Sequence, residues 1–529
     1  MKGIVILTGI FLSNLVWLLP GPGIAGEISP RLEAKIERLQ ADEEIDVLVF
    51  LADQVDLKQF RSLQRKDQRI SINTTLRKKA EKSQKTIKQF LRKSNGRNIK
   101  PFWIVNGLAV TLQAGVIAEI ARQPGVTRVT LDGTVSLPVA TVSSFTGNPT
   151  WNIDITDAWE LWQQGYDGSG VVVAIMDTGV DLQHQDLKER WRGGSNSWYD
   201  PNGEHPSPYD HDGHGTRTTG IILGGDAGGS AIGMAPGARW IGVKIFNDSG
   251  VASYSAIHLG FQWLLDPDND PQTDDLPHLV NNSWGLDELL NQCFTEFEAD
   301  IQALQASGIA VNFSAGNTGP NPASSISPAN YPESFAVGGV DSDLNVADFS
   351  SRGPSACNGG LYPAMAAPAV DIRTSDLTFG GLFVDNYAVV SGTSFAVPHI
   401  TGAMALLKNV RPWLTAEDLQ LVLTLSAVDL GISGTDHDSG YGLVNMAQAL
   451  DLLENNTCTG TNGHLYFSID GCKTTPKEGG GIFPVIQLLL GTTTAPHERN
   501  NGSPQSPLTG KNPLTHSIFT HEGYHESTI

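Results

Sequence analysis

An uninterrupted apolar run that ends in an acid and a glycine constrains the fold of this chain more than any other feature. Residues 171–179 read VVVAIMDTG. A strand of this kind is buried on both faces, which is typical of a parallel sheet covered by helices on either side. The sequence therefore predicts an α/β fold with a mostly parallel sheet. It also places Asp177 at the carboxyl end of a strand, where open α/β sheets build their sites, although an isolated D-T-G is more often a structural turn.

A second motif frames a histidine between two glycines. Residues 212–220 read DGHGTRTTG and lead into an apolar stretch. The glycines let the backbone approach closely and leave the ring of His214 accessible, as a general base requires. An isolated H-G-T is more often a solvated loop. His205 and His211 lack this framing and are interpreted as loop residues.

A third motif places a serine before a helix. Residues 391–399 read SGTSFAVPH, and a helical pattern follows at residues 400–407. A turn of small residues that leads into a helix presents Ser394 at the helix N-terminus. There, unpaired N–H groups and the helix dipole favour a developing negative charge. The alternative is that Ser394 is an ordinary N-cap residue.

The three motifs together indicate nucleophilic catalysis at a carbonyl group. A serine nucleophile needs a base that takes its proton and an acid that orients the base, and the chain offers one well-framed residue of each type. The motifs resemble the active-site signatures of the subtilisin-like (S8, subtilase) serine peptidases, which share the order Asp, His, Ser. The resemblance runs from about Trp151 to Leu453. The NSWG segment at 282–285 and the acidic loops are similar to bacillopeptidase F-like members of that family.

The resemblance assigns roles to particular residues. It makes Asp177, His214 and Ser394 the catalytic triad, and it makes Asn317 in the SAGN segment at 314–317 the donor to the tetrahedral oxyanion. Such a donor is worth roughly 10²- to 10³-fold in rate. The two segments that would pair with an extended peptide substrate, as an added strand, contain Ser283, Trp284, Gly285, Ala315 and Gly316. For Trp284, the alternative is simple core packing.

Two departures from the family pattern concern a neighbouring position and a metal site. Arg217 stands where the family commonly has a second histidine, so we expect altered local packing. The loop at 224–231 (GGDAGGSA) differs from the family's calcium loop, although Asp186 matches one calcium ligand. The acidic run at 266–270 lacks the features of an EF-hand loop and is interpreted as solvated. No cofactor is expected for the chemistry, and structural calcium stays unassigned.

The first 26 residues have the pattern of an export signal. Lys2 is followed by an uncharged stretch at 4–19 and then by small residues after a Pro-Gly-Pro turn. This stretch is shorter than the roughly 20 apolar residues of a membrane-spanning helix. The prediction is therefore a cleaved signal peptide, a secreted protein (extracellular or periplasmic) and no stable membrane anchor.

A small basic unit is expected at residues 27–137. The pattern predicts strands at 46–51, 103–112 and 126–131, a long polar helix at 57–93 and a short helix at 115–123. This order indicates a small α+β, ferredoxin-like fold. It resembles the inhibitor I9-type propeptides of the subtilases, which implies an intramolecular inhibitor and folding assistant. A linker follows at 138–150, and the resemblance implies self-cleavage between residues 136 and 150.

Charge is unevenly distributed along the chain. The 529 residues carry a formal net charge of −21, which argues against a nucleic-acid partner. Residues 27–140 contain 20 Lys and Arg against 13 Asp and Glu, whereas residues 141–529 contain 14 against 43. The contrast suggests an electrostatic latch between the two parts, and the alternative is two unrelated solvated surfaces.

The chain also contains four cysteines and a polar C-terminal tail. Four cysteines allow three disulfide connectivities, of which Cys293–Cys357 with Cys458–Cys472 is the expected one. The catalytic domain is expected at 151–455 and a loop-rich tail at 456–529.

Two other functional classes remain open. One is a catalytically silent relative that binds peptides without cutting them. The other is an esterase on an unrelated α/β fold, which the triad order and the lack of a G-x-S-x-G motif around Ser394 disfavour. The expected partners are protein or peptide substrates. The sequence does not reveal the preferred side chain before the scissile bond.

Overall fold

The computed structural model describes residues 26–60, 65–138, 141–143, 150–381, 385–455, 457–459 and 465–467. The predicted signal peptide, most of the tail and parts of the predicted linker lie outside these residues. The expected Cys458–Cys472 disulfide also lies outside them. Residues 26–138 are called the N-terminal module, and residues 150–455 are called the central module.

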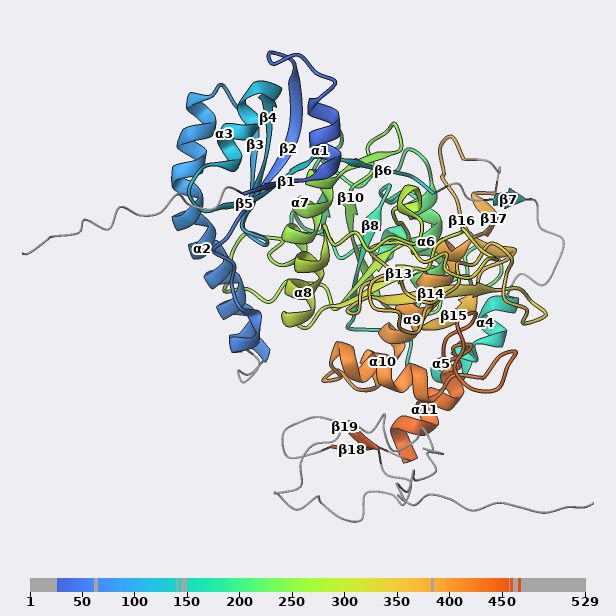
Figure 1. The fold of residues 1–529 in the computed structure, drawn as a ribbon. Helices are drawn as coiled ribbons and strands as arrows, with labels where there is room; N and C mark the ends of the chain where they lie inside the picture. Colours follow the sequence, from blue (N-terminus) through green and yellow to red (C-terminus); the bar gives the residue numbers. More distant parts are fainter. Residues whose placement is uncertain are drawn as a thin grey trace, which may run out of the picture. The chain divides into compact units, whose positions relative to one another are not determined.

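The central module is built on a sheet of seven parallel strands in the order β15-β14-β13-β12-β8-β10-β9 (Figure 1). The predicted apolar run forms its middle strand, β8. The strands are β8 (Val172–Asp177), β9 (Trp198–Tyr199), β10 (Arg239–Lys244), β12 (Leu279–Asn282), β13 (Ala310–Ser314), β14 (Phe335–Val340) and β15 (Met365–Pro368). The prediction of an α/β fold with a parallel sheet is confirmed.

Helices cover both faces of this sheet, which is why β8 is apolar throughout. Val173 and Ile175 pack into the layer that contains α9, and Ala174 and Met176 pack into the layer that contains α7 and α8. The helices are α4 (Trp151–Ile155), α5 (Ala158–Gln163), α6 (His214–Leu223), α7 (Tyr254–Leu264), α8 (Glu298–Ala306), α9 (Thr393–Val410), α10 (Ala416–Leu425) and α11 (Met446–Asn455), with short 3-10 turns η3 (Lys188–Arg190) and η4 (Asp287–Leu289). Among the described residues, no helix is long and apolar enough to cross a membrane.

The N-terminal module is a five-stranded sheet in the order β1-β5-β2-β4-β3 with three helices. Its elements are β1 (Glu27–Ile28), α1 (Pro30–Ile36), β2 (Glu44–Leu51), η1 (Leu57–Phe60), α2 (Arg65–Lys93), β3 (Arg97–Phe102), β4 (Gly107–Gln113), η2 (Ala114–Val116), α3 (Ile117–Ala121) and β5 (Val126–Leu131). The α+β class of this region agrees with the prediction.

One predicted strand of this module is wrong in its extent. Residues 97–113 form the hairpin β3–β4, and the apolar residues 103–105, predicted as the start of a strand, lie in its turn. Asn106 closes the turn in the left-handed region, at φ 44°, which asparagine tolerates. The turn is apolar because it packs against the central module: Trp103 N donates to Gln262 Oε1 of α7 at 2.5 Å, and Ile104 is buried.

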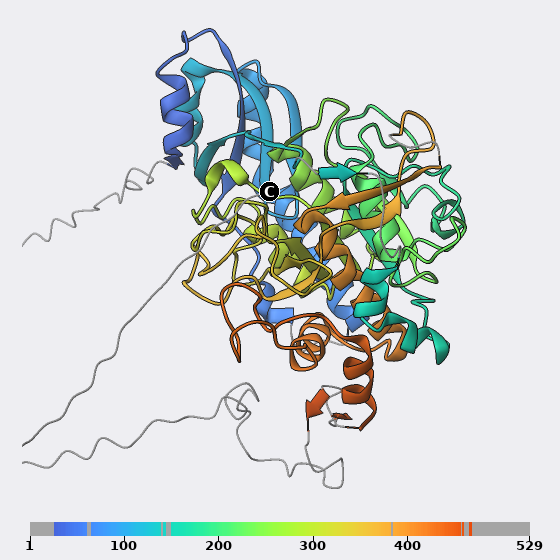
Figure 2. The ribbon, with the colours of Figure 1, turned by 90° about the vertical axis from the view of Figure 1, so that its right-hand side faces the viewer.

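The N-terminal module packs on α7 and α8 through one shared apolar cluster, and Figure 2 shows this region in a second view. Phe50 and Phe102 of the module lie in this cluster with Phe297 of the central module. Asp132 accepts a hydrogen bond from Ser255 N at the start of α7, 2.9 Å. Three ion pairs also cross the contact: Arg69–Asp274, Arg77–Asp266 and Arg128–Glu296.

After β5, the chain adds short strands to the central module at two separate places. β6 (Thr134–Ser136) pairs antiparallel with β11 (Val251–Ser253), and β7 (Thr141–Ser143) pairs antiparallel with β17 (Tyr387–Ser391). The region predicted as a linker thus contains a strand. The remaining strands are β16 (Ile372–Ser375), β18 (Thr457–Thr459) and β19 (Leu465–Phe467).

Candidate active site

The three motifs meet at the carboxyl edge of the parallel sheet. Asp177 is the last residue of β8, His214 is the first residue of α6, and Ser394 is the second residue of α9. Their relative exposures are 0%, 1% and 2%. The sheet topology positions Asp177. His214 and Ser394 are positioned by the starts of α6 and α9, which pack against each other.

Asp177 orients the ring of His214. The Nδ1 atom of His214 lies 2.8 Å from Asp177 Oδ1, which also accepts a hydrogen bond from Thr178 N at 2.7 Å. Burial lowers the pKa of His214, but the charge and hydrogen bond of Asp177, helped by Asp212, outweigh burial, so the pKa lies above 6.5. The arrangement favours a proton on Nδ1 and leaves Nε2 to act as the base.

The glycines that frame His214 serve close packing. Gly213 precedes α6 with φ 97°, a left-handed conformation that suits glycine. A Cβ atom on Gly215 would overlap the carbonyl oxygen of Gly179 in the D-T-G turn. The ring of His214 is buried rather than open in this form of the chain, and its Nε2 atom has no hydrogen-bond partner among the described residues.

Ser394 exchanges hydrogen bonds with a neighbouring segment. Its hydroxyl donates to the carbonyl oxygen of Ser283 at 3.1 Å, and the Ser283 hydroxyl donates to the carbonyl oxygen of Ser394 at 2.7 Å. The nucleophile is therefore close to the segment at 283–285 but is not bonded to His214. Catalytic hydrogen bonds often form only in the complex with substrate, and rotation about the Cα–Cβ bond of Ser394 redirects its hydroxyl.

The side chain of Asn317 is held by its oxygen. Asn317 Oδ1 accepts from Thr393 N at 2.8 Å and from the Thr393 hydroxyl at 2.9 Å. These bonds assign the amide orientation and leave the Nδ2 donor on the other side. That nitrogen would lie 3.5 Å from a Cβ atom built on Gly392, two residues before Ser394.

The two predicted substrate segments lie beside each other and beside Ser394. They follow the adjacent parallel strands β12 and β13, and Gly316 N donates to the Thr393 hydroxyl at 3.1 Å. The indole of Trp284 is fully buried against Phe297 and Phe313, with ring centroids 5.9 and 5.6 Å apart. The alternative interpretation of its side chain as core packing fits, and only its backbone is available to a peptide.

Sequence reasoning missed a third edge segment, β11. Its backbone accepts β6 in antiparallel register, with Ala252 opposite Val135, and Gly250 O accepts from Leu137 N at 3.0 Å. The turn-forming residues NDSG at 247–250, followed by the short stretch VAS, were the available signal.

Arg217, at the position where the sequence departs from the family pattern, forms a buried ion pair with Asp376. The guanidinium is buried and donates from Nε and Nη2 to Asp376 Oδ1, at 3.0 and 2.8 Å. A neighbouring cation lowers the pKa of a histidine, and Arg217 opposes Asp177 in this respect at His214.

The residues around Asp186 do not fit a calcium ion. Its carboxylate accepts from Ala227 N, 2.9 Å, and from the Tyr387 hydroxyl, 2.5 Å. In the loop at 224–231, the oxygens of Gly228 and Ser230 accept from Arg373, whose guanidinium also lies over the Tyr387 ring. Calcium requires six to eight oxygen ligands, whereas this loop offers one N–H donor to Asp186 and uses two of its oxygens to bind an arginine.

Two acidic groups among the described residues bring three ligand atoms within 4.8 Å of one another: Glu204 with His205 and Asp248, and Asp266 with Asp268 and Asp275. Both are already partnered by cations of the chain. Asp248 pairs with Lys244 at 3.0 Å, and Asp266 pairs with Arg77 at 2.5 Å. Asp266 is buried, which corrects the interpretation of this run as wholly solvated.

A buried charged group under the N-terminal module was also not predicted. The Nδ1 atom of His258 lies 2.9 Å from Asp300, its Nε2 atom lies 3.5 Å from Glu296, and Glu296 also faces Arg128. The rings of Phe50 and Phe102 lie 5.8 and 5.1 Å from the His258 ring. Burial lowers the pKa of His258, but the two carboxylates outweigh it and raise the pKa to about 10.

Comparison with known proteins identifies the class of this molecule. Residues 168–442, which include the whole site, match the Subtilase family (Peptidase S8). The chain belongs to this family of serine-type endopeptidases.

The chain is also similar to individual proteins of this family. The chain is 34% identical over 422 residues to bacillopeptidase F of Bacillus subtilis (strain 168), which covers 73% of this chain and 29% of that protein. It is 30% identical over 364 residues to subtilisin amylosacchariticus of Bacillus subtilis subsp. amylosacchariticus, covering 68% of this chain and 85% of the relative. It is 32% identical over 301 residues to subtilisin DY of Bacillus licheniformis, covering 56% and 97%.

Proposed function

We propose that this protein is a secreted serine endopeptidase that is made as a self-processed zymogen and acts through Asp177, His214 and Ser394. The observation that carries the proposal is the 2.8 Å bond from His214 Nδ1 to Asp177 at the carboxyl edge of the sheet, next to Ser394 at the start of α9. No cofactor takes part.

Each group has one chemical task. Ser394 Oγ attacks the peptide carbonyl while His214 Nε2 takes its proton and then donates it to the leaving amine. Asp177 holds the Nδ1 proton and stabilises the imidazolium. The backbone N–H of Ser394 and the Nδ2 donor of Asn317 bind the oxyanion of the tetrahedral intermediate. Water then hydrolyses the acyl-enzyme by the same steps.

Peptide substrates bind as an added strand in this proposal. β11 supports it, because it already accepts an extended segment in antiparallel register. The backbone of Ser283, Trp284 and Gly285 provides the opposite edge, and the backbone of Ala315 and Gly316 lines the space beyond it.

The N-terminal module is proposed to be the propeptide. It supplies β6, which pairs with β11, and the segment that follows the module supplies β7, where Thr141 pairs with Ser391, three residues before Ser394. The bond cut during maturation is then proposed to lie between Leu137 and Thr141, within the wider range expected from the sequence. The signal at residues 1–26 is proposed to export the precursor.

The first test is the variant Ser394→Ala. We expect it to accumulate as uncleaved precursor, whereas the wild type shows two cleavages by intact mass and N-terminal sequencing. A serine-directed fluorophosphonate should label Ser394 of the processed wild type. Normal maturation of purified Ser394→Ala would exclude self-processing, and an unlabelled processed protein that cuts no peptide would exclude the enzyme itself.

A further inference from the structure

The space between the two substrate segments is bounded by glycines. Gly285 ends the segment after β12, and Gly316 lies in the segment after β13, with φ 101°. Neither has a side chain, so the two backbones form the walls of a slot beside Ser394.

A substrate bound for attack directs one side chain into this slot. Its carbonyl carbon lies at Ser394 Oγ and its oxyanion lies at Asn317, as the proposed function requires. The residue that carries this carbonyl therefore has its Cα beside Ser283 and Gly316, and its side chain extends between the two segments. Under the proposed function, this slot therefore takes the side chain of the residue before the scissile bond.

The side chain of Ile326 already fills this slot. A Cβ atom built on Gly316 would lie 2.6 Å from Ile326 Cδ1, and one built on Gly285 would overlap the same atom. One methyl group thus contacts both walls. Ile326 is 1% exposed, so its side chain is covered by the protein.

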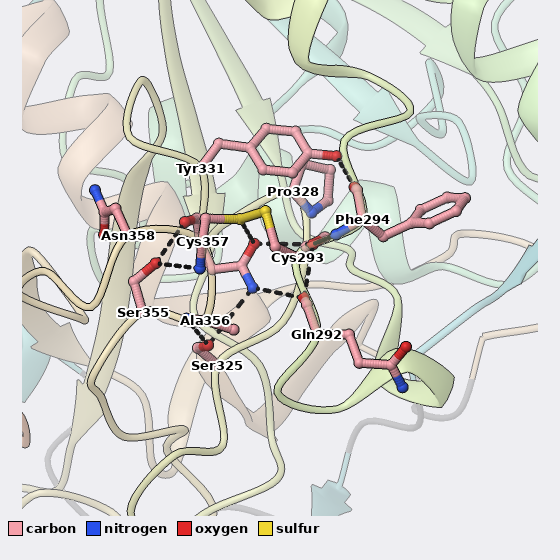
Figure 3. The surroundings of a disulfide bond; sticks show 12 residues. Gln292, Cys293, Phe294, Ser325, Pro328, Tyr331, Ser355, Ala356, Cys357 and Asn358 are labelled. Carbon is pink, nitrogen blue, oxygen red and sulfur yellow. Dashed lines mark hydrogen bonds between the residues drawn. A yellow bond between two sulfur atoms is a disulfide. The ribbon is translucent and has the colours of Figure 1, made fainter. Parts of the chain in front are cut away.

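The segment that carries Ile326 is fixed from several sides, and Figure 3 shows its bracing by the Cys293–Cys357 disulfide. Ser325 Oγ accepts from Ala356 N, and Ser327 Oγ accepts from Phe294 N, both at 3.0 Å; Ala356 and Phe294 each adjoin one of the two cysteines. The backbone oxygen of Ser327 accepts from Leu286 N at 2.8 Å, which ties the segment to the wall at Gly285.

We propose that Ile326 sets the specificity of the peptidase by closing the base of this slot, so that the enzyme cuts after small residues such as alanine or serine and rejects large aromatic ones. This inference rests on the proposed function and names its substrate class. The segment that carries Ile326 is held by the disulfide and by hydrogen bonds. Because it cannot move aside, a large substrate side chain does not fit into the slot.

The test uses the self-processed protein and three peptide p-nitroanilides that differ only in the residue before the scissile bond: alanine, leucine or phenylalanine. We expect kcat/KM for alanine to exceed that for phenylalanine by at least roughly tenfold, the smallest effect of one misfitting methylene in an apolar pocket. Ile326→Gly should raise kcat/KM for phenylalanine by roughly 10- to 200-fold and reverse the preference.

Graded variants protect the test against misfolding. Ile326→Val and Ile326→Ala remove Cδ1 with less disturbance and should shift the ratio in the same direction. Ile309→Val deletes a methyl group from an equally buried site away from the slot and should leave the ratio unchanged. A wild type that prefers phenylalanine, or a ratio that none of the Ile326 variants moves, overturns the inference. Failure to cut any peptide, with no fluorophosphonate adduct, would instead overturn the proposed function.

Discussion

In the proposed mechanism, Asn317 is held in position for a negative charge that forms only during the reaction. Both hydrogen bonds to its oxygen come from Thr393, the residue next to the nucleophile, so the amide cannot turn over without losing them. The donor is therefore oriented before substrate arrives, and no reorganisation is needed during the reaction.

Replacing this donor should affect the rate rather than binding. In Asn317→Asp the acceptor for Thr393 is kept and the N–H donor is lost, so we expect kcat to fall roughly 10²- to 10³-fold with little change in KM. Steady-state kinetics on a peptide p-nitroanilide measure this effect. An unchanged kcat would mean that the oxyanion is bound elsewhere, and an equal thermal midpoint for variant and wild type serves as the control for folding.

The acid limb of the pH profile, where activity falls as pH decreases, should report the protonation of His214. Because Asp177 and Asp212 hold its pKa above 6.5, the base is protonated over a wider range, and kcat/KM should fall as pH drops through a value above 6.5. Asp212→Asn keeps the hydrogen bond to His214 N and removes one charge, so the limb should move to lower pH. A limb that stays in place would show that Asp212 does not act on the histidine.

The sequence motifs located the residues that the structure brings together at the candidate site, but not the residues packed around them. Asp177, His214, Ser394 and Asn317 lie in short motifs whose composition the chemistry itself demands. Ile326 lies in no such motif, because it is singled out only by its contact with two glycines from other segments. Contacts of this kind depend on the packing of distant loops and have no local pattern.

The predicted helices and strands agree with the structure where the periodic pattern is long. The prediction is wrong where apolar residues form a contact between the two modules. The strands β5 and β8 and the helix α9 agree with their patterns, because each buries residues in the core of its own module. The turn between β3 and β4 was read as a strand because its apolar residues are buried against α7, which the local sequence does not reveal.

The Cys293–Cys357 disulfide, which joins two loops, should raise the free energy of unfolding. The two cysteines are 64 residues apart, and the chain-entropy estimate for a loop of this size is about 4 kcal/mol. Replacing both cysteines by serine should lower the free energy of unfolding by up to about this amount. Urea unfolding of the processed protein measures it, with the wild type under the same conditions as reference. A loss near zero would show that hydrogen bonds alone hold the braced segment.

Between the helices α7 and α8, His258 should make stability depend on pH. Its folded pKa of about 10 exceeds its ordinary value of 6.5, so its stabilising contribution is complete below 6.5 and is lost as pH rises through about 10. The difference in unfolding free energy between wild type and His258→Gln should therefore be larger at about pH 6 than at about pH 9.5. A difference that grows with pH would contradict the charged pair with Asp300.

At the scale of the whole molecule, the charge contrast of the two modules is matched by ion pairs across their contact. Arg69 and Arg77 of α2 meet Asp274 and Asp266 of one acidic loop. Salt screens such pairs where they are exposed. These contacts support the latch that the sequence suggested, but burial of the shared apolar cluster also holds the modules together.

The latch can be tested through the lag that follows processing, while the cleaved module stays bound and inhibits. The double variant Arg69→Gln/Arg77→Gln should shorten the lag roughly two- to tenfold at low salt and reduce its dependence on ionic strength. Lys79→Gln is the matched control, because Lys79 pairs with Asp53 inside the N-terminal module. If the control shortens the lag as much as the double variant, the latch is wrong.

The strands β6 and β7 have a kinetic consequence. They belong to the same polypeptide as the triad, so in the proposed maturation the local concentration of the first bond to be cut is set by the tether and not by the amount of protein present. Maturation should therefore follow first-order kinetics with the same half-time at every dilution. A peptide added from outside would have to compete with a segment that is never more than a short stretch of chain away.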